Sequence, residues 1–279
     1  AALPLADMDL AAKEYRRARL ELGLIGAILP INEFISLAHA KRMTPLFDLA
    51  EEIGGHLFIH PGRRPDETPP PGSPRRIPPF ADNSAARQAL SVQDRCAACM
   101  VTLLFSDFLD PYKNLLPHIA NLGGTLPMVI ERIDQVNLTR TPDQPTPSSK
   151  LGRVYVDCSS LGPKSIGIAA SFYGADKILF GTDCPIFLTQ WSKDAVRHSG
   201  LDEEGQHAVF EGNAKKILQN FKPDGVVPRL SCGFSEIRGI FGYEKNPATR
   251  PSPTPIRMRV RFRQRPTFRL ARNPRCGCP

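Results

Sequence analysis

The sequence predicts an α/β protein in which the strands form one parallel sheet. Short apolar runs alternate with segments of helical periodicity, and each run is followed by such a segment or by a loop leading to one. Strands separated by helices are joined by right-handed crossovers, so neighbouring strands run parallel. A chain of 279 residues that is 41% hydrophobic can form one large α/β domain or two small ones.

Each expected strand is a short apolar run with a clear boundary. LIGAILP closes with Pro30, and HLFIHPG closes with Pro61 and Gly62, residues that end regular ladders. LLPHIANLGG, RVYVDCSS and KILFGTD follow later in the chain. The five expected strands lie near residues 25–29, 56–60, 115–121, 153–158 and 177–183.

The expected helices have apolar residues at helical spacing and recognisable ends. The first stops at Gly23, the second starts at a Thr44 cap and ends on paired glycines, and the last begins at Asp202. The expected helices cover residues 9–22, 44–55, 84–108, 125–136, 165–175, 192–199 and 202–221.

Polar residues at the strand ends favour a barrel over an open sheet. His60, Asn121, Asp157 and Asp183 each stand at the end of an expected strand. The active site of an α/β barrel is built at the carboxyl ends of its strands, from such positions. An open doubly wound sheet would instead need a glycine-rich phosphate loop after an early strand, and the sequence has none.

The basic charge of the chain belongs to its last part. Residues 223–279 hold 12 of the 36 basic and three of the 28 acidic residues, so residues 1–222 hold 24 and 25 and are nearly neutral. We therefore expect no nucleic-acid binding by the body of the protein. The Pro- and Arg-rich segment 223–279 is expected to be a disordered tail or a non-native C-terminus, with RNA or acidic-surface binding as the alternative.

The cysteines and the hydropathy pattern predict a cytoplasmic protein that does not span a membrane. Seven cysteines at irregular spacing are typical of reduced thiols rather than of a disulfide framework. Cys96 and Cys99 form one Cys-x-x-Cys pair without a second pair nearby, so zinc or redox use is the weaker interpretation. No apolar run approaches the roughly 18 residues that a membrane span needs.

Two strand-end residues are candidate metal ligands. His60 follows Leu57-Phe58-Ile59 and precedes a proline, and Asp183 follows a buried-looking strand and precedes Cys184-Pro185. An imidazole and a carboxylate together suit Zn²⁺ or Mn²⁺ better than a calcium site. From the local sequence alone, a structural histidine and a turn or helix-cap aspartate remain the alternatives.

Several segments resemble one family in their order and spacing. They are ELGLIGAILP, PLFDLAEEIGGHLFIHPG, HIANLGGTLPMVIERID, RVYVDCSS, ADKILFGTDCPIF and GNAKKIL, of which FIHP and LFGTDCP are the most specific. The family is the amidohydrolase-related family of metal-dependent decarboxylases and hydrolases, which includes aminocarboxymuconate-semialdehyde, γ-resorcylate and 6-methylsalicylate decarboxylases. The resemblance runs from about residue 3 to residue 221.

The resemblance implies a TIM-barrel-like (β/α)₈ fold with one divalent metal, Zn or Mn, at the carboxyl ends of the strands. By the match, His60 would be the metal-binding histidine of the fifth strand, and Asp183 the metal-binding and proton-handling aspartate of the eighth. The family carries a catalytic histidine on its sixth strand, directly before Gly-Gly or Leu-Gly-Gly. Asn121 stands in that position here, so His118 becomes the acid–base candidate.

The position of His118 leaves an alternative open. Alternation along a strand puts residues 118 and 121 on opposite faces unless a bulge intervenes. The alternative is a packed histidine whose ring bonds a backbone carbonyl.

The family's first strand also bears a His-x-His pair of metal ligands that this sequence lacks. We therefore expect residues 1–222 to form a partial barrel, starting from about the third strand.

The function implied by the resemblance is metal-dependent, non-oxidative decarboxylation of a small aromatic or unsaturated carboxylic acid. A metal-dependent hydrolase of the same family is one alternative, and a catalytically inactive truncated barrel is another. The expected partner is the small-molecule carboxylic acid substrate, and assembly as a homo-oligomer is left open.

Overall fold

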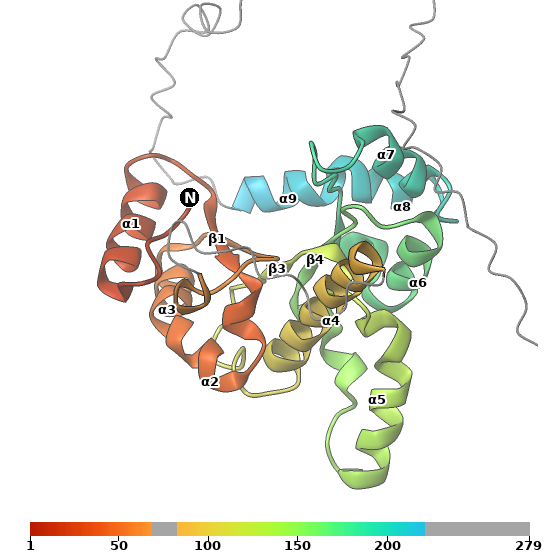
Figure 1. Cartoon of the computed structure of the whole chain (residues 1–279), viewed down its shortest axis with the longest axis horizontal. Coiled ribbons are helices and arrows are strands. Elements are labelled where there is room, and N and C mark those ends of the chain that lie inside the picture. Colours follow the sequence, from red (N-terminus) through yellow and green to blue (C-terminus); the bar gives the residue numbers. More distant parts are fainter. Residues whose placement is uncertain (69–82, 221–279) are drawn as a thin grey trace, which may run out of the picture. The chain divides into compact units, whose positions relative to one another are not determined.

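The computed structural model describes residues 1–68 and 83–220 (Figure 1). The proline-rich segment 69–82 and residues 221–279 lie outside the described residues. The predicted domain boundary at 222/223 and the predicted properties of the tail therefore stay predictions. In the described ranges, no helix is both long and apolar enough to cross a membrane.

Parallel strands form a five-stranded sheet in the order β1-β2-β3-β4-β5. The strands are β1 (Gly26–Pro30), β2 (His56–His60), β3 (His118–Ile119), β4 (Tyr155–Asp157) and β5 (Ile178–Leu179). Each strand lies inside a predicted strand or is displaced from it by one residue. The predicted parallel α/β sheet is therefore confirmed.

Strand β3 is shorter than the predicted run 115–121. After Ala120 the backbone of Asn121 and Leu122 turns into the left-handed region, with φ values of 59° and 53°. Gly123 and Gly124 continue with positive φ values of 67° and 69°, which glycine adopts at no steric cost. The chain therefore leaves the sheet at Asn121 instead of continuing the strand.

The helices match most of the predicted segments. They are α1 (Met8–Leu20), α2 (Leu37–Ala40), α3 (Thr44–Ile53), α4 (Ser84–Leu104), α5 (Leu126–Arg140), α6 (Pro163–Tyr173), α7 (Thr189–Arg197), α8 (Glu203–His207) and α9 (Asn213–Asn220). In Figure 1, α1–α3 lie near β1, and α6–α8 lie beyond β4.

Two details of the predicted helices were wrong. The single helix expected over 202–221 is divided by a π-helical turn at Ala208–Gly212, which lies between α8 and α9. The Thr44 cap is also not formed, because α3 begins at Thr44 itself and Pro45 occupies its first turn. By contrast, the Asp202 carboxylate accepts the backbone N–H of Gly205 at 2.8 Å and caps α8 as predicted.

The two faces of the sheet differ in chemistry. One face packs into the hydrophobic core, where Leu29, Leu57, Ile59, Ile119, Val156 and Ile178 are all 0% exposed. The other face carries His56, Phe58 and His60 from β2 beside His118 from β3. In a closed barrel the second face would be the interior.

The outer side of β1 is partly covered by the beginning of the chain. Ala2 makes an isolated parallel bridge with Ile28, whose N–H donates to the carbonyl oxygen of Ala1 at 2.9 Å. Ile28 points to the polar face of the sheet and is still 41% exposed. The face that would be the barrel interior is thus incompletely covered at this side.

Candidate functional site

His60 stands at the carboxyl end of β2 with one ring nitrogen already committed. Its Nδ1 lies 3.2 Å from the carbonyl oxygen of Pro61. Because a carbonyl oxygen only accepts, we assign the proton to Nδ1, which leaves the Nε2 lone pair available to a metal. The side chain is half-buried, and the Phe58 ring meets it edge-on with 5.3 Å between centroids.

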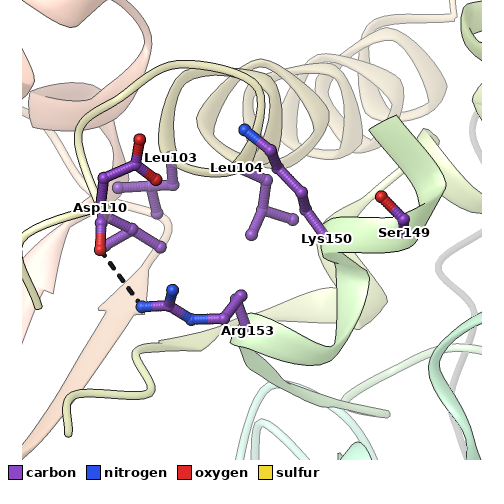
Figure 2. Close-up of a pocket in the computed structure, with 7 residues that line it drawn as sticks. Leu103, Leu104, Asp110, Ser149, Lys150 and Arg153 are labelled. Carbon is purple, nitrogen blue, oxygen red and sulfur yellow. Dashed lines mark hydrogen bonds between the residues drawn. The ribbon is translucent and has the colours of Figure 1, made fainter. Parts of the chain in front are cut away.

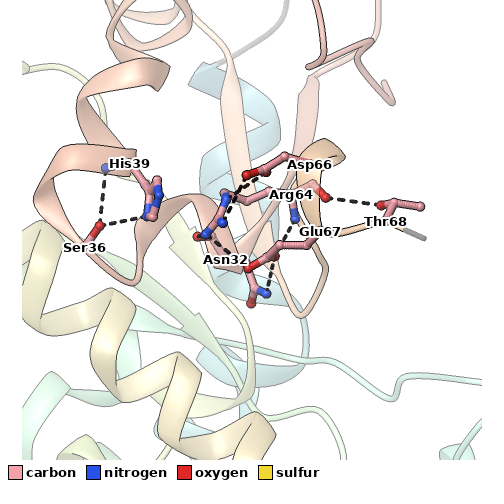
Figure 3. Close-up of polar contacts among 7 residues, drawn as sticks. All are labelled: Asn32, Ser36, His39, Arg64, Asp66, Glu67 and Thr68. Carbon is pink, nitrogen blue, oxygen red and sulfur yellow. Dashed lines mark hydrogen bonds and ion pairs between the residues drawn. The ribbon is translucent and has the colours of Figure 1, made fainter. Parts of the chain in front are cut away.

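A polar network holds the loop that follows His60 (Figure 3). The Arg64 guanidinium donates to the Asp66 carboxylate at 3.0 Å and pairs with the Glu67 carboxylate at 3.1 Å. The Asn32 side-chain amide donates to Glu67 at 2.7 Å, and the Asn32 backbone N–H donates to the Gly62 carbonyl at 3.3 Å. These bonds join the segments after β1 and β2, so the loop leaving His60 has a fixed path.

Asp183 lies four residues beyond the last residue of β5, in a tight turn. Its φ of 52° is in the left-handed region, which aspartate tolerates better than most side chains. Its carbonyl oxygen accepts the backbone N–H groups of Ile186 and Phe187 at 2.9 and 3.3 Å. The backbone makes a turn while the carboxylate stays half-exposed, so a turn and a binding site are compatible at this residue.

His118 is the middle member of a buried hydrogen-bond chain. Its Nε2 lies 2.9 Å from Oδ2 of Asp157, and its Nδ1 lies 3.1 Å from Nε2 of His56. The Phe58 ring stacks on the imidazole with 4.2 Å between centroids. Both ring nitrogens of His118 therefore have partners among side chains, and neither partner is a backbone carbonyl.

Burial and hydrogen bonding determine the charges along this chain. Burial, with a smaller contribution from His118, lowers the pKa of His56 to about 3, so that ring is neutral at pH 7. Burial alone would raise the pKa of Asp157, but hydrogen bonds from His118 and Ser159 bring it below its ordinary value. Asp157 is thus ionised at neutral pH although it is only 2% exposed.

Asn121 and His118 meet at the same carboxylate. The backbone N–H of Asn121 donates to Oδ1 of Asp157 at 3.3 Å, while His118 bonds Oδ2. Ala120 continues the face of His118 along the strand, and Asn121 lies already in the turn. Residues 118 and 121 therefore do not lie on opposite faces of one continuous strand. Asn121 lies in a turn, and the Asp157 carboxylate bonds both residues.

The predicted site residues are distributed over several strands. His60 ends β2 and Asp183 follows β5, with β3 and β4 between them in the sheet. Within residues 1–68 and 83–220, no group of three His, Cys, Asp or Glu side chains is arranged to hold a metal ion. His118 is joined to His56 and Asp157 instead of to either predicted metal ligand.

Sequence reasoning missed His56 as a functional candidate and used Asp157 only as evidence for a barrel. Two signals could have found them. His56 is four residues before His60 in a strand, so alternation places both on one face. Asp157 ends β4, the neighbour of the strand that carries His118.

The cysteines of the described part are free thiols. Cys96 and Cys99 are buried on α4, and burial raises the pKa of Cys96 to about 12 and that of Cys99 well above its ordinary value. Neutral buried thiols are neither good nucleophiles nor good metal ligands. The pair therefore belongs to the core.

A cavity of about 260 Å³ lies away from the strand carboxyl ends (Figure 2). Its lining comes from the end of α4 with Leu103 and Leu104, from the segment after that helix, and from the residues that lead into β4. The Arg153 guanidinium donates to the Leu109 carbonyl oxygen at 3.2 Å. Because Arg153 precedes β4, the cavity is at the amino end of that strand and is not the candidate site.

Comparison with known sequences identifies the family. The amidohydrolase family model matches residues 1–219. The 2-amino-3-carboxymuconate-6-semialdehyde decarboxylase of Dictyostelium discoideum is 24% identical over 223 residues, which are 77% of this chain and 59% of that protein. The γ-resorcylate decarboxylase of Polaromonas sp. is 25% identical over 234 residues, 78% of this chain and 69% of that protein.

Comparison with solved structures gives the same fold. A dihydroxybenzoic acid decarboxylase from Polaromonas sp. JS666, solved with manganese and the inhibitor 2-nitroresorcinol, matches with a TM-score of 0.59 and 22% identity. The match covers 78% of this chain and 68% of that one. This likeness confirms the predicted TIM-barrel-like fold. Because the family match extends over most of its length, the chain belongs to the amidohydrolase family.

Proposed function

We propose that this chain is a metal-dependent, non-oxidative decarboxylase of a small aromatic or unsaturated carboxylic acid. The observation that carries the proposal is that an imidazole, His60, ends β2 and that a carboxylate, Asp183, lies in the turn that follows β5. The names of the relatives support it, since they are decarboxylases of such acids. The chain spans 59% of the Dictyostelium relative, so the activity of the whole relative is proposed here rather than transferred.

The donor atoms fit a divalent metal in kind. The His60 Nε2 lone pair and the Asp183 carboxylate are donors that Zn²⁺ and Mn²⁺ accept. In number they are incomplete, since the described residues hold no arranged group of three donors. The remaining positions would be filled by substrate oxygens, by water, or by donors outside the described residues. When bound, the metal would supply a Lewis acid for the substrate's carboxylate and its adjacent oxygen.

The chain's own residues would move the proton. In decarboxylation the ring carbon gains a proton, the bond to the carboxyl carbon breaks, its electron pair returns to the ring, and CO₂ leaves. Asp183 is half-exposed and can reach a substrate, whereas both ring nitrogens of His118 are bonded within the chain. We therefore assign the donor role to Asp183 and the second proton-handling role to His118.

Metal analysis of the purified full chain, paired with turnover of 2,6-dihydroxybenzoate and 6-methylsalicylate, tests the proposal. We expect stoichiometric zinc or manganese and release of CO₂. His60→Ala and Asp183→Ala should each lose the metal, whereas His198→Ala, a change at an exposed histidine after α7, should keep it. Retention of the metal in either of the first two variants would remove that residue from the site.

An inactive partial barrel is the second candidate, and one observation favours it. The described residues offer two of the expected metal ligands without a third in place. This candidate predicts a folded chain with neither stoichiometric metal nor turnover. The hydrolase alternative, a cytoplasmic location and a homo-oligomeric state stay predictions. Ester or amide turnover, cell fractionation and light scattering, respectively, would test them.

A further inference from the structure

The cavity of about 260 Å³ at the amino end of β4 carries charged side chains of both signs (Figure 2). Its cations are Lys150 and Arg153, and its carboxylate is that of Asp110. The floor is apolar and consists of three buried leucines, Leu103, Leu104 and Leu109. An apolar floor surrounded by a few polar groups is typical of sites that bind small molecules.

Local backbone geometry brings the two cations to one side of the cavity. They belong to the 3₁₀ segment Pro147–Arg153, in which residues three positions apart lie on the same face. In Figure 2 the side chains of Lys150 and Arg153 extend from this segment toward the leucines and Asp110. The Nη2 atom of Arg153 donates to the carbonyl oxygens of Leu109 and Tyr112 at 3.2 and 2.5 Å. These two bonds fix the guanidinium at the cavity and join its two walls.

The charged groups of the cavity keep unused hydrogen-bonding capacity. Among residues 1–68 and 83–220, the Lys150 amine and the Nε and Nη1 atoms of Arg153 have no hydrogen-bond or ion-pair partner. In the same ranges the Asp110 carboxylate has no partner either, and it pairs with neither cation. The Ser149 hydroxyl, by contrast, is committed to the carbonyl oxygen of Thr146 at 2.5 Å. Donors and acceptors therefore face one cavity without satisfying each other.

The size and the charges of the cavity restrict its ligand. Sites for drug-sized ligands have volumes of roughly 300–1,000 Å³, so about 260 Å³ suits a smaller molecule. A plain carboxylic acid would pair with the two cations but would be repelled by Asp110. A plain amine would pair with Asp110 but would be repelled by Lys150 and Arg153. A molecule that carries an ammonium and a carboxylate on neighbouring carbon atoms satisfies both sides, and an aliphatic group on it would lie on the leucines.

We propose that this cavity binds a small aliphatic α-amino acid as its zwitterion. The carboxylate of the ligand accepts hydrogen bonds from Lys150 and Arg153, and its ammonium donates to Asp110. Both cations are half-buried, so their bonds to the ligand are less weakened by water than ion pairs on the open surface. The proposal does not depend on the proposed function, because the cavity lies at the amino end of β4, away from His60 and Asp183.

Methyl NMR of the full chain, labelled with carbon-13 at leucine, tests the proposal with unlabelled L-leucine as the probe. We expect saturable shifts of the methyl resonances of Leu103, Leu104 and Leu109. Two analogues remove one charge each: 4-methylpentanoate lacks the ammonium, and 3-methylbutylamine lacks the carboxylate. Each analogue should bind about tenfold more weakly or worse, since it loses charge-assisted hydrogen bonds. Absence of saturable shifts with L-leucine, or an equal affinity for either analogue, would overturn the proposal.

Two variants assign the contacts, and both should fold because neither side chain has a partner in the described part of the chain. Lys150→Gln should weaken L-leucine binding about tenfold or more. Asp110→Asn should abolish the preference for L-leucine over 4-methylpentanoate, because the ammonium then gains no ionic partner. Lys13→Gln, at an exposed lysine on α1, is the matched control and should keep wild-type affinity. Wild-type affinity in Lys150→Gln, or a full preference for L-leucine in Asp110→Asn, would overturn the proposal.

Discussion

Lowering the pH from 7 to 5 should destabilise this protein through His56. Burial lowers the pKa of the folded His56 ring to about 3, whereas an exposed histidine has an ordinary pKa of 6.5. The unfolded state therefore binds more protons than the folded state between these two values. By linkage, the free energy of unfolding falls as the pH drops below 6.5 and continues to fall toward 3.

The magnitude follows from the two pKa values. At pH 7 both states hold a mostly neutral ring, so His56 contributes little to the pH dependence. At pH 5 the unfolded ring is almost fully protonated and the folded ring is not. Each pH unit below 6.5 costs about 1.4 kcal/mol, so the loss at pH 5 is about 2 kcal/mol. The result depends weakly on the folded pKa, because any value below about 4 gives nearly the same loss at pH 5.

Urea unfolding of the full chain at pH 7 and pH 5, at equal ionic strength, measures this loss. Other groups also titrate in this range, so the decisive comparison is with His56→Gln, which keeps a side chain of similar length without an ionisable ring. The loss between the two pH values should be about 2 kcal/mol smaller in His56→Gln than in the wild type. His198→Gln, at an exposed site, should retain the full wild-type loss. Equal losses in His56→Gln and the wild type would show that His56 titrates normally in the folded protein.

Three further changes give separate tests by urea unfolding. Asn213→Ala should cost about 2 kcal/mol or more, because the buried amide donates to the carbonyl oxygens of Ala175 and Ile178, both at 2.8 Å; a loss below about 0.5 kcal/mol would contradict this role. Gly124→Ala should cost about 3 kcal/mol or more, since its φ is +69° and a Cβ would lie 1.9 Å from a backbone oxygen. Gly152→Ala is its control, because a Cβ there meets nothing within 4 Å; equal stability of the two variants would refute the clash. Glu33→Gln should stabilise the protein at pH 7 and stabilise it progressively less as the pH is lowered. Burial raises the pKa of the Glu33 carboxyl, so ionisation of this group destabilises the folded state as the pH rises. A Glu33→Gln variant that is destabilised at pH 7 would show that the carboxylate has a stabilising ionic role.

The fold could be predicted from local patterns because each strand is a self-contained signal. An apolar run with glycine or proline near its end needs no knowledge of its neighbours to be recognised, and five such runs gave five strands. The spacing of apolar residues could not show that β3 ends at Ile119, because a left-handed turn such as the one at Asn121 leaves no periodic pattern of apolar residues. It also could not show the π-helical turn at Ala208–Gly212, since one extra residue in a turn barely disturbs helical spacing.

The candidate metal ligands were visible in the sequence for the same reason. His60 and Asp183 each end or follow one strand within a short motif, so a single segment suffices to place them. The hydrogen-bond chain of His56, His118 and Asp157 was invisible because it joins residues that are 62 and 39 positions apart in the sequence. Only the register that sets Phe58 beside His118, and His118 beside Tyr155, brings the two imidazoles and the carboxylate into contact.

The candidate metal ligands and the hydrogen-bonded residues His56, His118 and Asp157 therefore depend on different parts of the structure. A metal at His60 and Asp183 needs further donors, which the described residues do not hold in an arranged group. The hydrogen-bond chain of His56, His118 and Asp157 needs only β2, β3 and β4, which are neighbours in the sheet, and its burial keeps His56 neutral. If the protein binds no metal, nitrogen-15 NMR should still detect a scalar coupling across the hydrogen bond between His56 and His118, because neither His60 nor Asp183 takes part in that bond. If the metal and the coupling between His56 and His118 were both absent, the sheet itself would require the metal for its structure. The separate positions of the metal ligands and of the hydrogen-bonded residues argue against such a requirement.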